Sequence, residues 1–86
     1  MFYLYILRSL KNNTLYVGST NDLNRRLLEH RKGLGGYTKK YLPYQLLYYE
    51  AYRSEADAPK RESNLKLRSN AFNQLKRRLS GSLKTH

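Results

Sequence analysis

The sequence contains no cysteine, which excludes a disulfide-stapled scaffold, a thiolate zinc site and a cysteine nucleophile. Long hydrophobic runs are also missing, because the longest apolar stretch is Met1–Leu7 and no basic segment precedes it. This stretch is too short to span a bilayer and lacks the layout of a secretion signal, so we expect a cytoplasmic protein without a membrane partner.

Acidic residues are scarce. The chain has six Asp and Glu but 17 Lys and Arg, which gives a net charge of +11 over 86 residues and a pI of about 10.1. The excess is concentrated in residues 59–86, which contain eight basic residues and one acidic residue. Such a charge favours nucleic acid as the partner, whereas a solvated, solubilising surface is the simpler alternative. A membrane-surface helix fits less well, because the apolar face of this segment is narrow.

Three segments are typical of β-strands. Aromatic and β-branched residues predict strands over 2–7, 15–17 and 45–52, with Gly18 ending the second. Lys11–Thr14 has turn chemistry, so the first two strands form a hairpin.

Three further segments are typical of helices, over about 23–32, 57–68 and 69–79. Asp57 is favoured as the cap of the second helix, because it places Pro59 in the first turn. The sequence therefore predicts an α/β fold: a small mixed or antiparallel three-stranded sheet flanked by helices, in the order β-β-α-β-α-α. We expect a single domain over residues 1–80, taken as a monomer, with a frayed tail over 81–86.

Three clusters have residue types suited to phosphodiester chemistry. Tyr3 and Tyr5 share a face of the first strand and Tyr16 can join them from the second, although core tyrosines would show the same pattern. Arg26 and His30 share a helix face, where a guanidinium suits a phosphoryl oxygen; a solvated surface pair would look alike.

Glu62 is the third candidate, because it is the one acid of the basic segment. Its carboxylate could bind a divalent cation together with waters and substrate phosphate. The alternative is a simple ion pair with Lys66, four residues later on the same helix.

Together these residues resemble the GIY-YIG nuclease superfamily, in particular its small single-domain bacterial-type (UPF0213-like) members. The first motif is Tyr3-Leu4-Tyr5-Ile6-Leu7 and the second is Tyr16-Val17-Gly18-Ser19-Thr20, followed by Arg26, His30 and Glu62 at family spacing. The resemblance covers about residues 2–79, and its specificity lies in the combined spacing rather than in any single motif.

The resemblance implies a metal-dependent endonuclease acting on nucleic acid, with DNA expected rather than RNA. By analogy, Tyr5 and Tyr16 orient or deprotonate the attacking water, and Arg26 holds the scissile phosphate. Glu62 would bind the single divalent cation, Mg²⁺ or Mn²⁺, and His30 would lie near the phosphate or leaving group. A supporting asparagine that family members often carry after the glutamate has three candidates here: Asn70, Asn73 and Gln74.

Further basic and aromatic residues are predicted to contact nucleic acid outside the reaction centre. They are Tyr3, Arg25, Arg31, Lys39, Lys40, Lys66, Arg68, Lys76, Arg77 and Arg78. Two other functions stay open at this point: a catalytically inactive nucleic-acid-binding module and an RNA-associated basic protein. The full set of candidate catalytic residues favours an enzyme over the first, and Glu62 weighs against the second.

Overall fold

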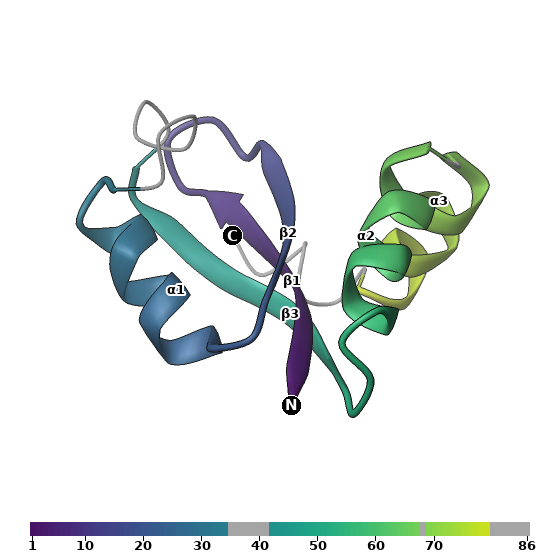
Figure 1. Cartoon of the computed structure of the whole chain (residues 1–86). Helices are drawn as coiled ribbons and strands as arrows, with labels where there is room; N and C mark the ends of the chain where they lie inside the picture. The colour runs from purple at the N-terminus through teal and green to yellow at the C-terminus, as the bar shows by residue number, and fades with distance from the viewer. Residues whose placement is uncertain (35–41, 68, 80–86) are drawn as a thin grey trace.

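The computed structural model describes residues 1–34, 42–67 and 69–79 of the chain. Its strands are β1 (Phe2–Ser9), β2 (Leu15–Thr20) and β3 (Tyr44–Tyr52), and its helices are α1 (Leu23–Arg31), α2 (Asp57–Leu67) and α3 (Ser69–Arg78). The strands form one antiparallel sheet in the order β2-β1-β3. The predicted α/β fold and the order β-β-α-β-α-α are confirmed (Figure 1).

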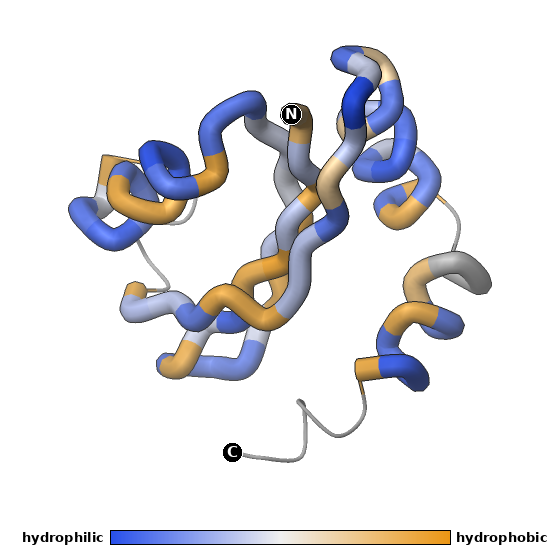
Figure 2. The backbone as a smooth tube through the Cα atoms, turned by 90° about the horizontal axis from the view of Figure 1, so that it is seen from below, coloured by the Kyte–Doolittle hydropathy of each residue, from blue (hydrophilic) through white to orange (hydrophobic). Residues whose placement is uncertain are grey.

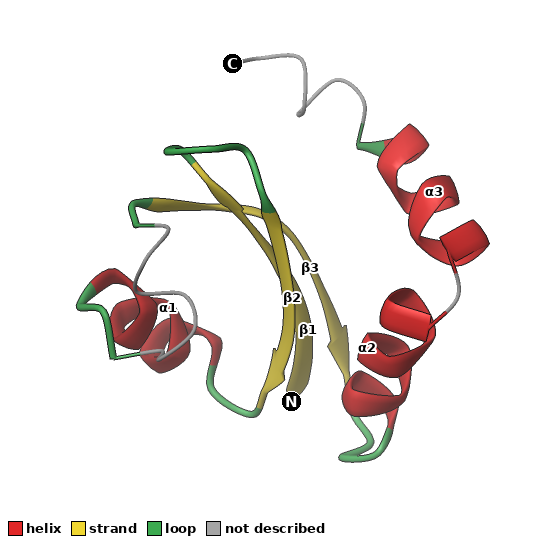
Figure 3. Cartoon of the chain, turned by 90° about the horizontal axis from the view of Figure 1, so that it is seen from above, coloured by secondary structure: helices red, strands yellow, loops and turns green. Residues whose placement is uncertain are grey.

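The sheet lies between two helical layers. Figure 3 shows α1 on one face and α2 with α3 on the other. Central strand β1 is therefore buried on both faces, and Leu4, Tyr5, Ile6 and Leu7 are each at most 2% exposed. Because side chains alternate along a strand, Tyr5 faces α1 while Leu4 and Ile6 face α2 and α3.

The hydrophobic core fills the space between the sheet and the α2–α3 layer. Leu4, Ile6 and Val17 contact Leu65 of α2 and Leu75 of α3 in one buried cluster. Phe72 of α3 and Leu79, which follows the helix, also pack against this cluster. Elsewhere the helices are mostly hydrophilic, with hydrophobic residues recurring at intervals along them (Figure 2). Among the described residues, no helix is long and apolar enough to cross a membrane.

Two boundaries differ from the sequence-based expectation. Strand β2 does not end at Gly18 but continues to Thr20, because Gly18, Ser19 and Thr20 all pair with β1. Helix α2 begins at Asp57 itself, so Asp57 is a first-turn acid rather than the cap. Its carboxylate still lies at the helix end where a negative charge is stabilising. The tail over 81–86 lies outside the described residues.

Candidate active site

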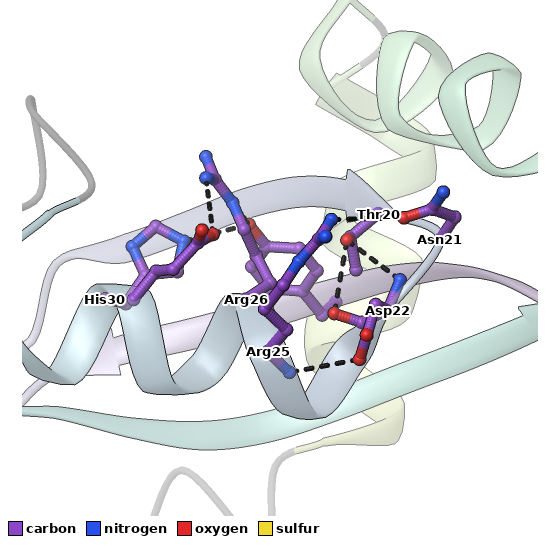
Figure 4. Close-up of polar contacts among 8 residues, drawn as sticks. Thr20, Asn21, Asp22, Arg25, Arg26 and His30 are labelled. Carbon is purple, nitrogen blue, oxygen red and sulfur yellow. Dashed lines mark hydrogen bonds and ion pairs between the residues drawn. The ribbon is translucent and has the colours of Figure 1, made fainter.

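Four of the predicted site residues meet on the α1 face of the sheet. The Tyr5 hydroxyl lies 2.9 Å from His30 Nε2 and accepts a hydrogen bond of 3.4 Å from Arg26 Nε. The Tyr16 ring stands edge-on to His30, with ring centroids 5.3 Å apart, and lies 6.2 Å from the Tyr5 ring. Strands β1 and β2 supply the tyrosines. Figure 4 shows Arg26 and His30, which project from α1.

Exposure divides these four residues into two pairs. Tyr5 and His30 are each 1% exposed. Tyr16 is partly exposed, and 35% of the Arg26 side chain is accessible. A molecule approaching this face would therefore meet Tyr16 and Arg26, with Tyr5 and His30 buried behind them.

Burial sets the protonation states of the inner pair. It raises the pKa of Tyr5 to about 12, in spite of the hydrogen bond from Arg26, so this phenol is neutral at physiological pH. Burial, followed by the nearby Arg26 charge, lowers the pKa of His30 below 6.5, so the imidazole is neutral as well. A neutral imidazole can accept a hydrogen bond from the Tyr5 hydroxyl at Nε2, while the Tyr5 oxygen accepts a hydrogen bond from Arg26.

Gly18 makes room for this arrangement. It lies directly opposite Tyr5 in the β1–β2 ladder. A Cβ atom at position 18 would lie 2.5 Å from the Tyr5 hydroxyl oxygen and 3.1 Å from a ring carbon of Tyr16. Both tyrosine rings therefore need glycine at this point of β2.

Helix α1 is fixed at its N-terminus, which places Arg26 over the sheet. The Asp22 carboxylate caps the helix by accepting a 3.1 Å hydrogen bond from the Arg25 backbone N–H, and the Thr20 hydroxyl accepts one of 3.1 Å from the Asp22 N–H. Figure 4 shows these contacts beside Arg26. Arg26 also forms an ion pair of 3.2 Å with Glu29, and the bonds to Tyr5 and Glu29 raise its pKa, so it stays charged.

Glu62 reaches the site from the other side of the sheet. It projects from α2, and its Oε1 accepts a 2.7 Å hydrogen bond from Ser19 Oγ, whose side chain faces away from Tyr16 and Gly18. Because β2 is an edge strand among the residues that the structure describes, one strand separates the two faces at this point. The first four residues and Glu62 thus lie on opposite sides of β2.

Lys66 holds the second carboxylate oxygen of Glu62. Its Nζ lies 2.6 Å from Oε2, which is the ion pair that the sequence offered as an alternative to a metal ligand. Within the described part of the chain, no three His, Cys, Asp or Glu side chains are grouped to hold a metal ion. Glu62 is the carboxylate on this side of β2 that could hold a divalent cation, since a hard cation can be bound by one carboxylate together with waters.

The remaining predicted contact residues are distributed over both faces. Tyr3 lies on the α1 face but packs its ring against Tyr49, with centroids 6.2 Å apart. Arg25 and Arg31 are exposed on α1, and Lys76, Arg77 and Arg78 are exposed on α3, together with Asn73 and Gln74. Lys39, Lys40 and Arg68 lie outside the described residues.

Three neighbours of the site were not anticipated from the sequence. Tyr44 packs against His30 with ring centroids 6.3 Å apart, Glu29 pairs with Arg26, and Ser19 binds Glu62. The i,i+3 spacing of Arg26 and Glu29 could have revealed the second contact. The other two join segments far apart in the sequence, for which no local pattern gives a signal.

A second polar cluster joins β3 to α2 without touching this site. The Glu50 carboxylate accepts hydrogen bonds from Tyr48, Tyr52 and Arg61. Burial alone would raise the pKa of Glu50, but these bonds outweigh it and leave the pKa lowered. With every group paired, this cluster fastens α2 to the sheet.

Residues 1–78 match the family model of the GIY-YIG catalytic domain. The chain belongs to the GIY-YIG family. Its relatives include a UPF0213 protein of Pediococcus pentosaceus, 44% identical over 69 residues, which covers 79% of this chain and 72% of the relative. A UPF0213 protein of Streptococcus pyogenes serotype M3 is 40% identical over 74 residues, covering 85% of this chain and 79% of the relative.

A solved structure agrees with this assignment. The solution NMR structure of a UPF0213 protein from Bacillus halodurans is 32% identical, with a TM-score of 0.53, and the match covers 87% of this chain and 83% of that one. This GIY-YIG domain is therefore a small UPF0213 member, as the motifs indicated. The match includes Tyr5, Tyr16, Arg26, His30 and Glu62 within its bounds.

Proposed function

We propose that this GIY-YIG domain is a divalent-metal-dependent endonuclease that hydrolyses phosphodiester bonds in DNA. The observation that carries the proposal is the pairing of accessible Tyr16 and Arg26 with the buried, neutral Tyr5–His30 pair behind them. With 35% of its side chain exposed, the charged Arg26 above this pair is accessible to an approaching anion.

Arg26 is proposed to bind the non-bridging oxygens of the scissile phosphate. Its guanidinium is permanently charged and presents its donors in a planar fork, which suits an oxyanion that gains charge in the transition state. Glu29 now accepts from Nη1, so the incoming phosphate replaces that contact. The bond from Nε to Tyr5 keeps the guanidinium in place meanwhile.

Tyr16 is proposed to orient the attacking water, because its ring is accessible and lies beside Arg26's partner Tyr5. Tyr5 and His30 are then positioning residues: they are too buried to contact a substrate, and they hold Arg26 and Tyr16 by the contacts described above. An oriented water is needed for DNA in particular, because DNA lacks the 2′-hydroxyl that can act as an internal nucleophile in RNA.

Glu62 is proposed as the ligand of the divalent cation, which would supply charge neutralisation for the phosphate and its leaving oxygen. Ser19 fixes one carboxylate oxygen, and Lys66 would give up the other. A phosphodiester lying along the free edge of β2 would have Arg26 and Tyr16 on one side and Glu62 on the other. Because β2 is an edge strand, a single phosphodiester could contact residues on both faces of the sheet.

The predicted contact residues that flank this edge would bind further phosphates. Arg25 and Arg31 extend from α1 on one side, and Lys76, Arg77 and Arg78 extend from α3 on the other. Tyr3, next to its partner Tyr49, would add a stacking surface on the α1 side.

The direct test is cleavage of end-labelled DNA, offered as single strand, duplex and flap, beside RNA of the same sequences. Each reaction is run with Mg²⁺, with Mn²⁺ and with chelator. The proposal predicts internal cuts in DNA that need the metal. Equal cleavage of RNA would contradict the DNA preference, and an intact substrate in every reaction would favour a binding module instead.

A further inference from the structure

A groove of about 510 Å³ runs along β2 on the side of α2 and α3. It is lined by Leu15, Tyr16 and Val17 of β2, by Leu65 and Lys66 of α2, and by Phe72 of α3. Its volume lies in the range of small-ligand sites. Lys66 lines this groove and also pairs with Glu62, so the groove adjoins the carboxylate proposed to bind the metal ion.

Phe72 gives the groove an aromatic surface. The ring is partly buried against the core, and Lys76 Nζ lies 5.0 Å from its centroid. The ammonium therefore covers one face of the ring in a cation–π contact, which places a positive charge directly beside the aromatic surface. A flat aromatic ligand could take that position while the lysine turns to an adjacent anion.

The charge around the groove identifies that ligand further. Lys66 lines it and Lys76 lies over its Phe72 ring, whereas Leu15 and Val17 on the strand side are apolar. An aromatic surface between cations matches a nucleobase with phosphates on either side of it. A base within a duplex has its faces covered by its neighbours, so the matching ligand is an unpaired base.

We infer that this groove binds one unpaired nucleobase next to the scissile phosphodiester, by stacking on Phe72. The inference rests on the proposed function, because the phosphate held by Arg26 and the base in the groove belong to one strand. It gives the substrate class of that site: nucleic acid that is single-stranded at the cut, or frayed there.

Binding in chelator tests the inference without any cleavage. The probe is a short fluorescent single-stranded DNA, with a series in which one position at a time is abasic and with the same sequence as a duplex. Phe72→Leu keeps apolar volume against the core but removes the ring face, and Phe72→Tyr restores it. Phe2→Leu is the matched control, because it makes the same change at a partly buried ring that does not line this groove.

The wild type should lose affinity for one abasic position in particular. Phe72→Leu should weaken binding of intact single strand roughly five- to tenfold and remove that positional effect, as loss of one stacked base requires. Phe72→Tyr and Phe2→Leu should keep the effect. Weakening of duplex and single strand to the same degree, or no abasic effect in the wild type, would overturn the inference. An abasic effect without hydrolysis in metal would overturn the proposed function and leave the subsite standing.

Discussion

At the scale of single residues, Arg26 is the group whose chemistry is most specific. We expect Arg26→Ala to lower the single-turnover rate by roughly two to three orders of magnitude, the range seen when one transition-state donor is removed. Arg26→Lys should not restore it, because an ammonium lacks the planar fork. Binding in chelator should change much less than the rate.

Arg31→Ala is the matched control for this experiment, since it removes an exposed arginine from the same helix outside the cluster. A lysine variant with near-wild-type rates would show that positive charge alone is enough. Equal losses of rate in the two alanine variants would show that Arg26 does not act specifically on the transition state.

His30 should make folding stability depend on pH. Its pKa is lowered in the folded protein by burial and by Arg26, whereas an unfolded histidine titrates near 6.5. Between these two values the unfolded chain binds more protons, so the free energy of unfolding rises with pH there. The contribution is complete above about 6.5 and is lost as pH falls through the folded-state pKa.

Denaturant unfolding of wild type and His30→Gln across that interval measures this contribution. The variant should show a flatter pH profile, because glutamine can accept the Tyr5 hydrogen bond without titrating. The lowered pKa of Glu50 acts in a more acidic window, below 4.5, and should be seen in both proteins. Parallel profiles above that window would mean that His30 titrates normally.

The individual site residues could be named from the sequence because their motifs are local and their spacing is fixed. Which of these residues are buried and which are accessible could not be predicted from the sequence. Tyr5 and Tyr16 look equivalent in sequence, but central strand β1 buries Tyr5 to 1% exposure, whereas edge strand β2 leaves Tyr16 accessible. Burial depends on sheet order, which a single motif does not contain.

At the scale of the elements, β2 is the part of the fold on which the site depends. Gly18→Ala would place a Cβ 2.5 Å from the Tyr5 oxygen, so the ring must move away from His30 and Arg26. We expect a loss of roughly 1–3 kcal/mol in the free energy of unfolding, as overpacking costs, together with a lower cleavage rate.

A double-mutant cycle identifies the cause. Tyr5→Leu removes the two nearest atoms that the new Cβ would meet, so adding Gly18→Ala to it should cost less than in the wild type. Additive effects of the two changes would show that the glycine is needed for another reason.

Helix α3 is expected to bind backbone phosphate without reading sequence. Arg77→Gln with Arg78→Gln should weaken binding of unrelated sequences to a similar degree and reduce the salt slope by roughly one to two units. The control pair is Lys11→Gln with Arg53→Gln, which removes the same charge from exposed positions away from α3. Equal slopes in both double variants would mean that only net charge matters.

Element positions followed well from the sequence, because the apolar stripe of α3 and the aromatic strands are periodic. The end of β2 could not be predicted from the sequence. Glycine usually weakens a strand, but here Gly18 pairs with Tyr5 and is kept for the space it leaves. That reason is a contact between two strands, which the sequence of one strand alone does not reveal.

At the scale of the whole molecule, two helical layers cover the opposite faces of one sheet, and β2 is an edge strand of that sheet in the described part of the chain. Helix α1 brings arginine and histidine to one face, and α2 brings the carboxylate to the other. The net charge of +11 draws a polyanion to the molecule, and the cations flanking β2 lie where it would bind. The central claim is that Glu62 and Arg26 act on one phosphate across that edge.

The most direct measurement compares Glu62→Gln with Glu55→Gln, each for cleavage rate in Mg²⁺ and for DNA affinity in chelator. Both changes remove one carboxylate charge from the same part of the chain, but Glu55 is exposed in the connection before α2. We predict that Glu62→Gln abolishes cleavage and binds DNA as well as the wild type or better, while Glu55→Gln cuts normally. Wild-type turnover by Glu62→Gln in Mg²⁺ would contradict the account, leaving Glu62 as a simple ion-pair partner of Lys66.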